Sequence, residues 1–281
     1  MMNVIPQIAL ADGTQVPALG LGTWKMGERA ATAEREVEAL AHGLDLGLTL
    51  VDTAEMYGDG GAEEIVARAI AGRRRSTFVV SKVYPQNAGI KSMAAACERS
   101  LGRLAIDCID LYLLHWRGSV PLAETVDGFE RLRTAGKIRR WGVSNFDIAD
   151  MEELDALPNG PRCATNQVLY NLSERGIEWR LLKWCNEHRV AVMAYSPVAQ
   201  GAILTDRKLS AIAREANLKP AQLALAWVMS RPGVIAIPQS SNTAHIDEIR
   251  ASAGIPLDAE VLKALDAAFP PPRRATPLSV I

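Results

Sequence analysis

Four polar residues of this 281-residue sequence have the chemistry needed to protonate a carbonyl oxygen: Asp52, Tyr57, Lys82 and His115. A tyrosine hydroxyl has an ordinary pKa of about 10, so it is a reluctant acid near neutral pH. A nearby ammonium lowers the pKa of the phenol, and a carboxylate behind that ammonium keeps the lysine charged and in position. A neutral histidine beside the phenol can orient a carbonyl oxygen through a hydrogen bond. Together these residues predict proton donation beside a hydride transfer.

Each of the four residues also has a purely structural explanation when it is considered alone. Lys82 can be a surface lysine whose stem lies along apolar surface, and His115 can be a hydrogen-bonded core histidine. Tyr57 can be an interfacial phenol without a role, and Asp52 can cap the next element. The catalytic interpretation therefore depends on a fold that brings the four together.

Asp52, Lys82 and His115 end three successive apolar segments that we predict to be strands. The eight predicted strands cover residues 19–23, 48–52, 77–82, 108–115, 138–143, 163–167, 190–195 and 234–237. Helical patterns separate and follow them, over residues 32–46, 62–71, 91–104, 121–135, 147–154, 174–188, 208–216, 220–230 and 243–251. Eight strand-then-helix units favour a single-domain (β/α)8 TIM barrel over residues 1–281. Asp110 interrupts one strand that is otherwise apolar.

Additional elements are expected at both ends of the chain. Asp12-Gly13 predicts an N-terminal β-hairpin outside the main sheet, and residues 258–269 form an extra C-terminal helix before an irregular tail.

An open, doubly wound α/β sheet is the structural alternative. That fold would need a glycine-rich phosphate-binding turn, which Gly20 and Gly22 superficially suggest. Lys25 stands where the third glycine would be, so the dinucleotide fingerprint fails.

In a barrel, the carboxyl ends of all strands converge on one mouth, so polar residues at these positions become neighbours. The polar residues at or just beyond the predicted strand ends are Asp52, Lys82, His115, Ser144, Asn145, Gln167, Tyr195 and Ser240, with Tyr57 in the loop after Asp52. Glu55, in that same loop, is expected to be a solvated residue without a role.

The composition excludes several classes of partner. Lys plus Arg total 31 and Asp plus Glu total 32, so neither nucleic acid nor a membrane surface is expected as a partner. The four cysteines are scattered, which argues against a disulfide framework or a metal site and fits a protein with reduced thiols. Without a recognisable signal peptide or membrane span, the expected location is cytoplasmic.

Several sequence motifs resemble signatures of the aldo-keto reductases, in the same order along nearly the whole chain. They are DTAEMYG, VVSKVYP, LYLLHW, GKIRRWGVSNF, NQVLYN, VMAYSP and IPQSS. Within that family the chain looks most like bacterial cytoplasmic reductases of small reactive aldehydes, including methylglyoxal reductases. The resemblance implies a barrel, a small-molecule carbonyl substrate, a monomer or weak oligomer, and NADP(H) bound without a Rossmann domain. It makes Tyr57 the general acid, with Asp52, Lys82 and His115 completing a tetrad.

The resemblance also assigns cofactor and substrate contacts. Ser144, Asn145 and Gln167 would hold the nicotinamide carboxamide, and the ring of Tyr195 would stack on the nicotinamide. The full set of implied cofactor contacts is Thr23, Trp24, Asp52, Ser144, Asn145, Gln167, Tyr195, Ser196, Pro197, Val198, Ile237, Gln239, Ser240, Ser241, Asn242, His245 and Glu248. The substrate pocket would be lined by Trp24, Tyr57, His115 and Trp116. The other tryptophans, Trp141, Trp179, Trp184 and Trp227, are expected to be packing residues.

The sequence departs from the family pattern where the adenosine end should bind. Many members carry a lysine and an arginine where this chain has Gln239 and His245, and neither replacement supplies a permanent charge for a 2′-phosphate. Ser240, Ser241 and Asn242 still offer donors at the start of a helix. We therefore expect NADPH with a weakened preference over NADH, so that NAD(H) is also a candidate. Short loops after His115 and Tyr195 suggest an open pocket for small aldehydes.

Two other functions remain compatible with these residues. A cofactor-binding regulatory or structural protein, like potassium-channel β-subunits or lens crystallins, could keep the barrel with little turnover. A lyase or isomerase that uses Lys82 as a Schiff base is disfavoured, because Asp52 should keep the amine protonated. A serine hydrolase is disfavoured, because the sequence has no GxSxG motif.

Overall fold

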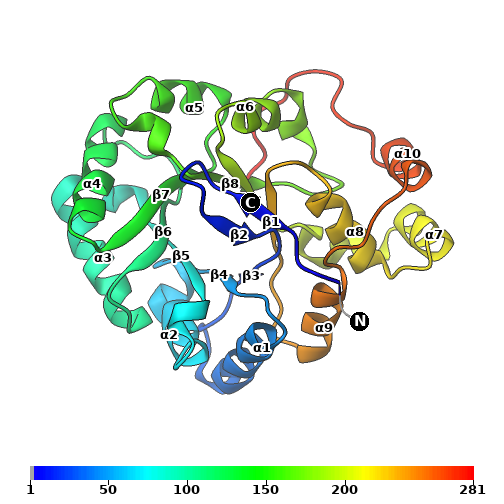
Figure 1. Ribbon diagram of the computed structural model, residues 1–281, viewed down its shortest axis with the longest axis horizontal. Coiled ribbons are helices and arrows are strands. Elements are labelled where there is room, and N and C mark those ends of the chain that lie inside the picture. Colours follow the sequence, from blue (N-terminus) through cyan, green and yellow to red (C-terminus); the bar gives the residue numbers. More distant parts are fainter. Residues whose placement is uncertain (1–2) are drawn as a thin grey trace.

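A computed structural model describes residues 3–281 and shows an eight-stranded parallel β-barrel surrounded by helices (Figure 1). The strands are β3 (Leu21–Gly22), β4 (Leu50–Asp52), β5 (Phe78–Val83), β6 (Ile109–Leu114), β7 (Ile138–Ser144), β8 (Thr165–Leu169), β9 (Ala191–Tyr195) and β10 (Val234–Ile237). They pair in sequence order from β3 to β10. Isolated parallel bridges, Leu19 with Ala236 and Gly22 with Gln239, join the two edge strands and close the barrel. The predicted fold class is confirmed.

Helices follow the strands and form the outer ring. They are α1 (Ala33–Asp45), α2 (Gly61–Ala69), α3 (Ile90–Leu104), α4 (Leu122–Thr134), α5 (Ile148–Asp155), α6 (Leu181–Glu187), α7 (Arg207–Glu215), α8 (Pro220–Met229), α9 (Thr243–Ala251) and α10 (Ala259–Ala268). The single helix predicted over residues 174–188 was wrong in its first half. A 3₁₀ turn, Gly176–Trp179, precedes α6 there, because Arg180 has a non-helical backbone with φ −145° and ψ −45°. No helix among residues 3–281 is long and apolar enough to cross a membrane.

The strands fill the barrel interior with apolar side chains at every second position. Leu50, Val80, Leu113, Met193 and Ile237 belong to one buried cluster inside the barrel. Because side chains alternate between the two faces of a strand, the residue two positions further on points to the same interior. Those residues are Asp52, Lys82, His115, Tyr195 and Gln239. The polar mouth is thus the direct continuation of the apolar barrel core.

The predicted hairpin, β1 (Gln7–Ala9) and β2 (Gln15–Pro17), lies across the opposite opening of the barrel (Figure 1). Leu10 and Val16 join the interior apolar cluster and cover it from this side. Arg140 on β7 donates to Asp12 in the hairpin turn over 2.6 Å. The hairpin therefore closes the barrel at the amino-terminal ends of its strands, and the opening at their carboxyl ends stays open.

Asp110 lies near this sealed end, on the second residue of β6. One carboxylate oxygen accepts from the Val79 backbone N–H at 2.9 Å and pairs with Arg74 at 2.8 Å, and the other accepts from Arg139 at 3.1 Å. The side chain thus satisfies a backbone donor of the neighbouring strand. This explains why a carboxylate interrupts an apolar strand.

The C-terminal segment 270–281 returns from α10 to the centre of the barrel (Figure 1). Arg175 anchors its start through Asp266, at 2.8 Å, and the Phe269 carbonyl. Further along, Leu278 packs against the core, and Ile281 lines the cavity at the barrel mouth. The tail is irregular, as expected, but it also forms part of the mouth.

Two of the four tryptophans predicted to be packing residues, Trp141 and Trp227, are fully buried. Trp184 is partly buried and stacks on His188 with ring centroids 3.9 Å apart. The prediction for Trp179 was wrong, since 46% of this residue is exposed. It lies in the 3₁₀ turn before α6, where a surface loop replaces the predicted helix.

Candidate active site

A cavity of about 670 Å³ opens at the carboxyl ends of the strands. It is lined by all the predicted cofactor and substrate residues except Thr23. Thr23 is buried behind the wall and donates to the Asp52 backbone carbonyl at 3.0 Å. Lys82 is also fully buried and does not line the cavity. The structure therefore brings the predicted residues to one place, with two of them behind the surface.

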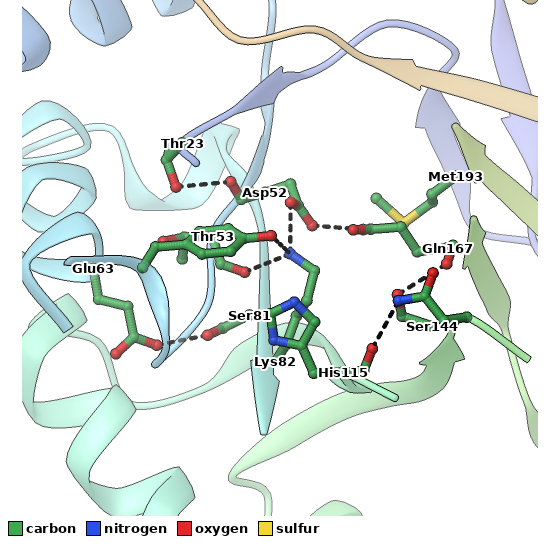
Figure 2. A network of polar contacts seen from close by, with 12 residues as sticks. Thr23, Asp52, Thr53, Glu63, Ser81, Lys82, His115, Ser144, Gln167 and Met193 are labelled. Atoms are coloured by element: carbon green, nitrogen blue, oxygen red, sulfur yellow. Dashed lines mark hydrogen bonds and ion pairs between the residues drawn. The ribbon is translucent and has the colours of Figure 1, made fainter. Parts of the chain in front are cut away.

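Lys82 is the centre of a compact polar network (Figure 2). Its ammonium donates to Asp52 Oδ2 at 2.7 Å, to the Thr53 carbonyl at 2.9 Å and to the Tyr57 hydroxyl oxygen at 3.1 Å. These three bonds use all three N–H groups of an ammonium. Desolvation lowers the pKa of Lys82, but Asp52 and Tyr57 more than offset this, so the pKa is raised above its ordinary value. The lysine remains charged although it is buried.

Tyr57 opens a tight 3₁₀ turn, Tyr57–Gly60, between β4 and α2. Gly58 has φ +58°, and a Cβ atom there would lie 2.8 Å from the Met26 carbonyl oxygen. Only glycine allows the turn to pack this closely against the backbone of the Met26 segment. Burial raises the pKa of Tyr57 above its ordinary value, and the Lys82 ammonium only opposes this effect. Lys82 thus lowers the pKa of Tyr57 in the expected direction, but burial outweighs it, so the net shift is upward and the hydroxyl keeps its proton at neutral pH.

His115 packs edge-on against Tyr57, with ring centroids 5.6 Å apart. Desolvation and the Lys82 charge lower the pKa of His115 to about 2, so the ring is neutral at physiological pH. Its Nδ1 is buried and has no hydrogen-bond partner among the described residues. The other ring nitrogen, Nε2, is therefore the one available to a ligand in the cavity.

Amide and hydroxyl groups on or just after β7, β8 and β9 form the opposite wall. Figure 2 shows Ser144 and Gln167 in this wall. Asn145 donates to the His115 carbonyl at 3.2 Å and accepts from the Tyr195 hydroxyl at 2.9 Å. Ser144 Oγ donates to the Gln167 backbone carbonyl at 2.9 Å. Gln167 Nε2 donates to Asp52 Oδ1 at 2.8 Å. The wall thus offers fixed donors and acceptors beside the proposed proton donor.

The far end of the cavity is built from the start of α9. Asn242 caps this helix by accepting from the Ala244 N–H at 2.9 Å, and Ser240 Oγ accepts from the Asn242 N–H at 3.1 Å. His245 Nδ1 lies 3.4 Å from Ser240 Oγ. Glu248 also lines this end and pairs with Lys219 at the N-terminus of α8. In the described residues, no three metal-ligating side chains lie close enough to hold a metal ion.

The sequence profile described as "Aldo/keto reductase family" matches residues 18–269, which is most of the chain. The protein belongs to this family.

Relatives of this aldo/keto reductase cover almost its full length. Methylglyoxal reductase YeaE of Escherichia coli (strain K12) is 50% identical over 279 residues, which are 98% of each chain. Glyoxal reductase of Bacillus subtilis (strain 168) is 34% identical over 242 residues, which are 86% of this chain and 84% of the relative. The aldo/keto reductase from Klebsiella pneumoniae, solved in complex with NADP and acetate, is 49% identical. It superposes with a TM-score of 0.96 over 99% of this chain and 100% of that chain.

Sequence reasoning missed Lys25 as a cavity residue of this aldo/keto reductase. Lys25 served only to reject a dinucleotide fingerprint, yet it lines the cavity with φ +68°. Its ammonium lies 4.4 Å from the centre of the Trp24 ring. A cation directly after a strand-end tryptophan was the available signal. Ile281 was missed as well, and no local pattern in the tail pointed to it.

The prediction that Glu55 is a solvated loop residue was wrong. Only 6% of Glu55 is exposed, and it accepts from the Tyr84 N–H at 2.8 Å and from the Asn87 side chain at 3.1 Å. Tyr84 in turn packs edge-on against Trp116, with ring centroids 5.9 Å apart. Glu55 therefore supports the loop behind one wall of the pocket, because a buried loop needs acceptors for its backbone donors.

Proposed function

We propose that this protein reduces small aldehydes and ketoaldehydes, such as methylglyoxal, with NADPH and with Tyr57 as the general acid. The observation that carries the proposal is the buried Asp52–Lys82–Tyr57 network, which opens into the cavity beside a neutral His115. The methylglyoxal reductase activity of the 50% identical YeaE protein and the NADP bound to the Klebsiella protein support the same assignment.

The residues of the cavity fit a nicotinamide dinucleotide. A primary carboxamide has one acceptor and two donor hydrogens, and the wall formed by Ser144, Asn145 and Gln167 offers both kinds of partner. Tyr195 adds a flat aromatic face at the same wall. The N-terminus of α9, with Ser240, suits an anionic group at the far end. The cofactor, when bound, supplies the hydride.

The protein's own residues would position the carbonyl and deliver the proton. His115, neutral and at the cavity surface, would donate a hydrogen bond that orients the carbonyl oxygen. As the carbonyl carbon accepts the hydride, its oxygen takes the hydroxyl proton of Tyr57. The resulting phenolate would be stabilised by the Lys82 ammonium at 3.1 Å, and Asp52 would hold that ammonium in place. The aldehyde would gain a hydride at its carbon and the Tyr57 proton at its oxygen, two electrons and two protons in all, and leave as an alcohol.

Tyr57→Phe tests this assignment and separates it from a binding protein with little turnover. The variant should lose about 10² to 10⁴-fold in carbonyl reduction, because general acid catalysis is removed. NADPH binding, followed by fluorescence quenching, should remain close to wild type. Turnover close to wild type would remove Tyr57 from its role. Cofactor binding by the wild type without any turnover of a panel of small aldehydes would favour a regulatory or structural protein.

The cofactor preference is tested by comparing kcat/KM for NADPH and NADH. Gln239 and His245 provide no permanent charge at the far end of the cavity, so we propose a modest preference for NADPH and measurable use of NADH. A large advantage for NADH would overturn this preference.

The substrate size is tested by comparing methylglyoxal with a steroid ketone; better efficiency with the steroid would contradict the assignment to small aldehydes.

A Schiff-base mechanism is the remaining rival. Lys82 is fully buried, uses its three N–H groups and has a raised pKa, all of which oppose nucleophilic attack. Borohydride trapping of a substrate on Lys82 would revive this rival.

We also propose that the protein acts in the cytoplasm, because the cysteines of the described chain are free thiols, and that it is a monomer or weak oligomer.

A further inference from the structure

Asp52 is bonded on both sides by residues that the proposed reaction uses for different purposes (Figure 2). Its Oδ2 accepts from the Lys82 ammonium at 2.7 Å, and its Oδ1 accepts from Gln167 Nε2 at 2.8 Å. Asp52 is 3% exposed, Gln167 is 2% exposed and Lys82 is fully buried, so water does not compete for these bonds. One carboxylate therefore connects the acid network on β4 and β5 with the amide wall on β8.

The bond to Asp52 determines which way the Gln167 amide points. An ionised carboxylate only accepts hydrogen bonds, so the NH2 group of Gln167 must face Asp52. The same nitrogen lies 3.9 Å from Met193 Sδ, a weak acceptor that receives its second hydrogen. The amide oxygen, Oε1, has no donor among the described residues and is not one of the buried unsatisfied atoms. Because Gln167 lines the cavity, Oε1 is left as an acceptor for a ligand.

A flipped amide would present the opposite chemistry to the cavity. With Oε1 toward Asp52, two oxygen acceptors would face each other at 2.8 Å inside a buried site, which is strongly unfavourable. The cavity would then present N–H donors instead of an acceptor. The negative charge of Asp52 is what excludes this orientation.

We propose that Asp52 is a positioning residue for the cofactor as well as for the proton donor. By holding Gln167 in one orientation, it makes this wall select a nicotinamide carboxamide, whose NH2 group donates, over the corresponding nicotinic acid, whose carboxylate only accepts. The second oxygen of the same carboxylate holds Lys82 under Tyr57. Asp52 thereby positions both the cofactor that would supply the hydride, through Gln167, and the tyrosine that would supply the proton, through Lys82. This inference rests on the proposed use of a nicotinamide dinucleotide.

The test is the discrimination between NADP and its nicotinic acid analogue, nicotinic acid adenine dinucleotide phosphate. The two ligands differ only in the group that would meet Gln167. We expect the wild type to bind NADP at least about tenfold more tightly than the analogue, because a fixed acceptor faces a donor in one case and an anion in the other. Dissociation constants come from protein fluorescence quenching, so no turnover is needed.

A double-mutant cycle separates the positioning effect from the charge of Asp52 itself. Gln167→Met keeps the size of the side chain and the charge of Asp52 but removes the amide. It should lower the discrimination to about threefold or less. Asp52→Asn should lower it by a similar factor, because its neutral amide no longer fixes Gln167. In the double variant the loss should not exceed that of either single variant, since both remove the same interaction.

Two results would overturn the proposal. Multiplicative losses in the double variant would show that Asp52 acts through its own charge, independently of Gln167. Full discrimination in Gln167→Met would show that Gln167 does not read the carboxamide. If the wild type binds neither ligand, the proposed function fails instead. If it binds NADP and reduces aldehydes but the cycle is multiplicative, only the coupling fails.

A measurement on the wild type keeps the proposal testable if Asp52→Asn does not fold. The Gln167 side-chain amide should give a pair of ¹⁵N-correlated NMR signals with slow hydrogen exchange in the cofactor-free protein. Gln167→Met identifies these signals by their disappearance. Rapid exchange of this amide with solvent would contradict a fixed bond to Asp52.

Discussion

Asp52 on β4 and Asp110 on β6 are both buried aspartates of the same barrel, but they lie at opposite ends of their strands. Asp52 is the last residue of β4, at the open mouth, whereas Asp110 is the second residue of β6, at the end closed by the hairpin. Their exposed fractions, 3% and 8%, are similar. Both accept hydrogen bonds on both oxygens. Burial and bonding alone therefore do not separate a catalytic carboxylate from a structural one.

The partners make the difference. Asp110 pairs with Arg74 and Arg139, whose side chains are 29% and 61% exposed and keep contact with water. Asp52 pairs with Lys82, which is completely enclosed and touches the hydroxyl of Tyr57. Because water does not solvate the Lys82 ammonium, its electrostatic interaction with the Tyr57 hydroxyl, which lies at the cavity, is only weakly screened. The same residue type thus stabilises the fold at one end and prepares a proton donor at the other.

The largest expected effect is on activity at the mouth. Asp52→Asn should lower kcat/KM for a small aldehyde by about 10²-fold or more, because Lys82 loses its charged partner and Tyr57 its stabilised phenolate. Asp110→Asn is the matched variant and should change kcat/KM by less than about twofold. A comparable loss in both variants would break the distinction between the two ends.

His115, which also lies at the open mouth, should make the stability of the protein depend on pH. Its pKa is about 2 in the folded protein, well below the ordinary value of about 6.5. As the pH falls below about 6.5, the unfolded chain binds a proton that the folded protein does not, so acid favours unfolding. Between pH 7 and pH 5 this one group should cost about 2 kcal/mol of stability.

His115→Gln should remove this contribution, and urea unfolding at pH 5, 7 and 8 measures it. The comparison at pH 8 is the control, because neither state of the wild type binds a proton at this position there. An equal loss of stability on acidification in both proteins would show that the imidazole is not held neutral.

At the closed end, the expected effect is on stability alone. Asp110→Asn should lower the free energy of unfolding by about 1–2 kcal/mol, because a charge-assisted acceptor for two arginines and a backbone N–H becomes a neutral amide. Replacement of the more exposed partner, Arg139→Gln, should cost about 0.5 kcal/mol or less. Urea unfolding at pH 7 tests both. A larger effect of the arginine would mean that its charge is not screened by water.

The smallest effect is expected at the hairpin. Asp12→Asn removes the charge that pairs with Arg140 but keeps an oxygen for the Thr14 N–H. Asp12 is 48% exposed in its side chain, so the change should be about 0.5 kcal/mol or less in unfolding free energy. A loss of several kcal/mol would show that the hairpin depends on this pair more than on the apolar contacts of Leu10 and Val16.

The sequence was informative wherever a short-range rule determined the outcome. Apolar alternation located the strands, and the period of two carried the same inward face from Leu50 to Asp52 and from Val80 to Lys82. The convergence of strand ends then brought residues from distant motifs to one cavity. This is why the barrel and the group around Tyr57 were predictable from local patterns.

The remaining features depend on packing between segments that are far apart in the chain. The pKa of Tyr57 depends on how completely its turn is buried, and burial outweighs the lysine that the sequence pointed to. Glu55 is buried because it accepts from Tyr84, 29 residues away. The bond from Gln167 to Asp52 spans 115 residues and depends on side-chain conformations. No periodicity or motif encodes such contacts.

The path of the C-terminal tail has a practical consequence for work with the recombinant protein. Ile281 lies at the lining of the cavity, whereas Asn3 at the other end of the described chain bonds to Gly254 on the outside of the barrel. An affinity tag or a fluorescent protein joined after Ile281 would start at the entrance that ligands must pass. Fusions belong at the amino terminus, and kinetic constants measured with a carboxyl-terminal tag would include the effect of the tag on access.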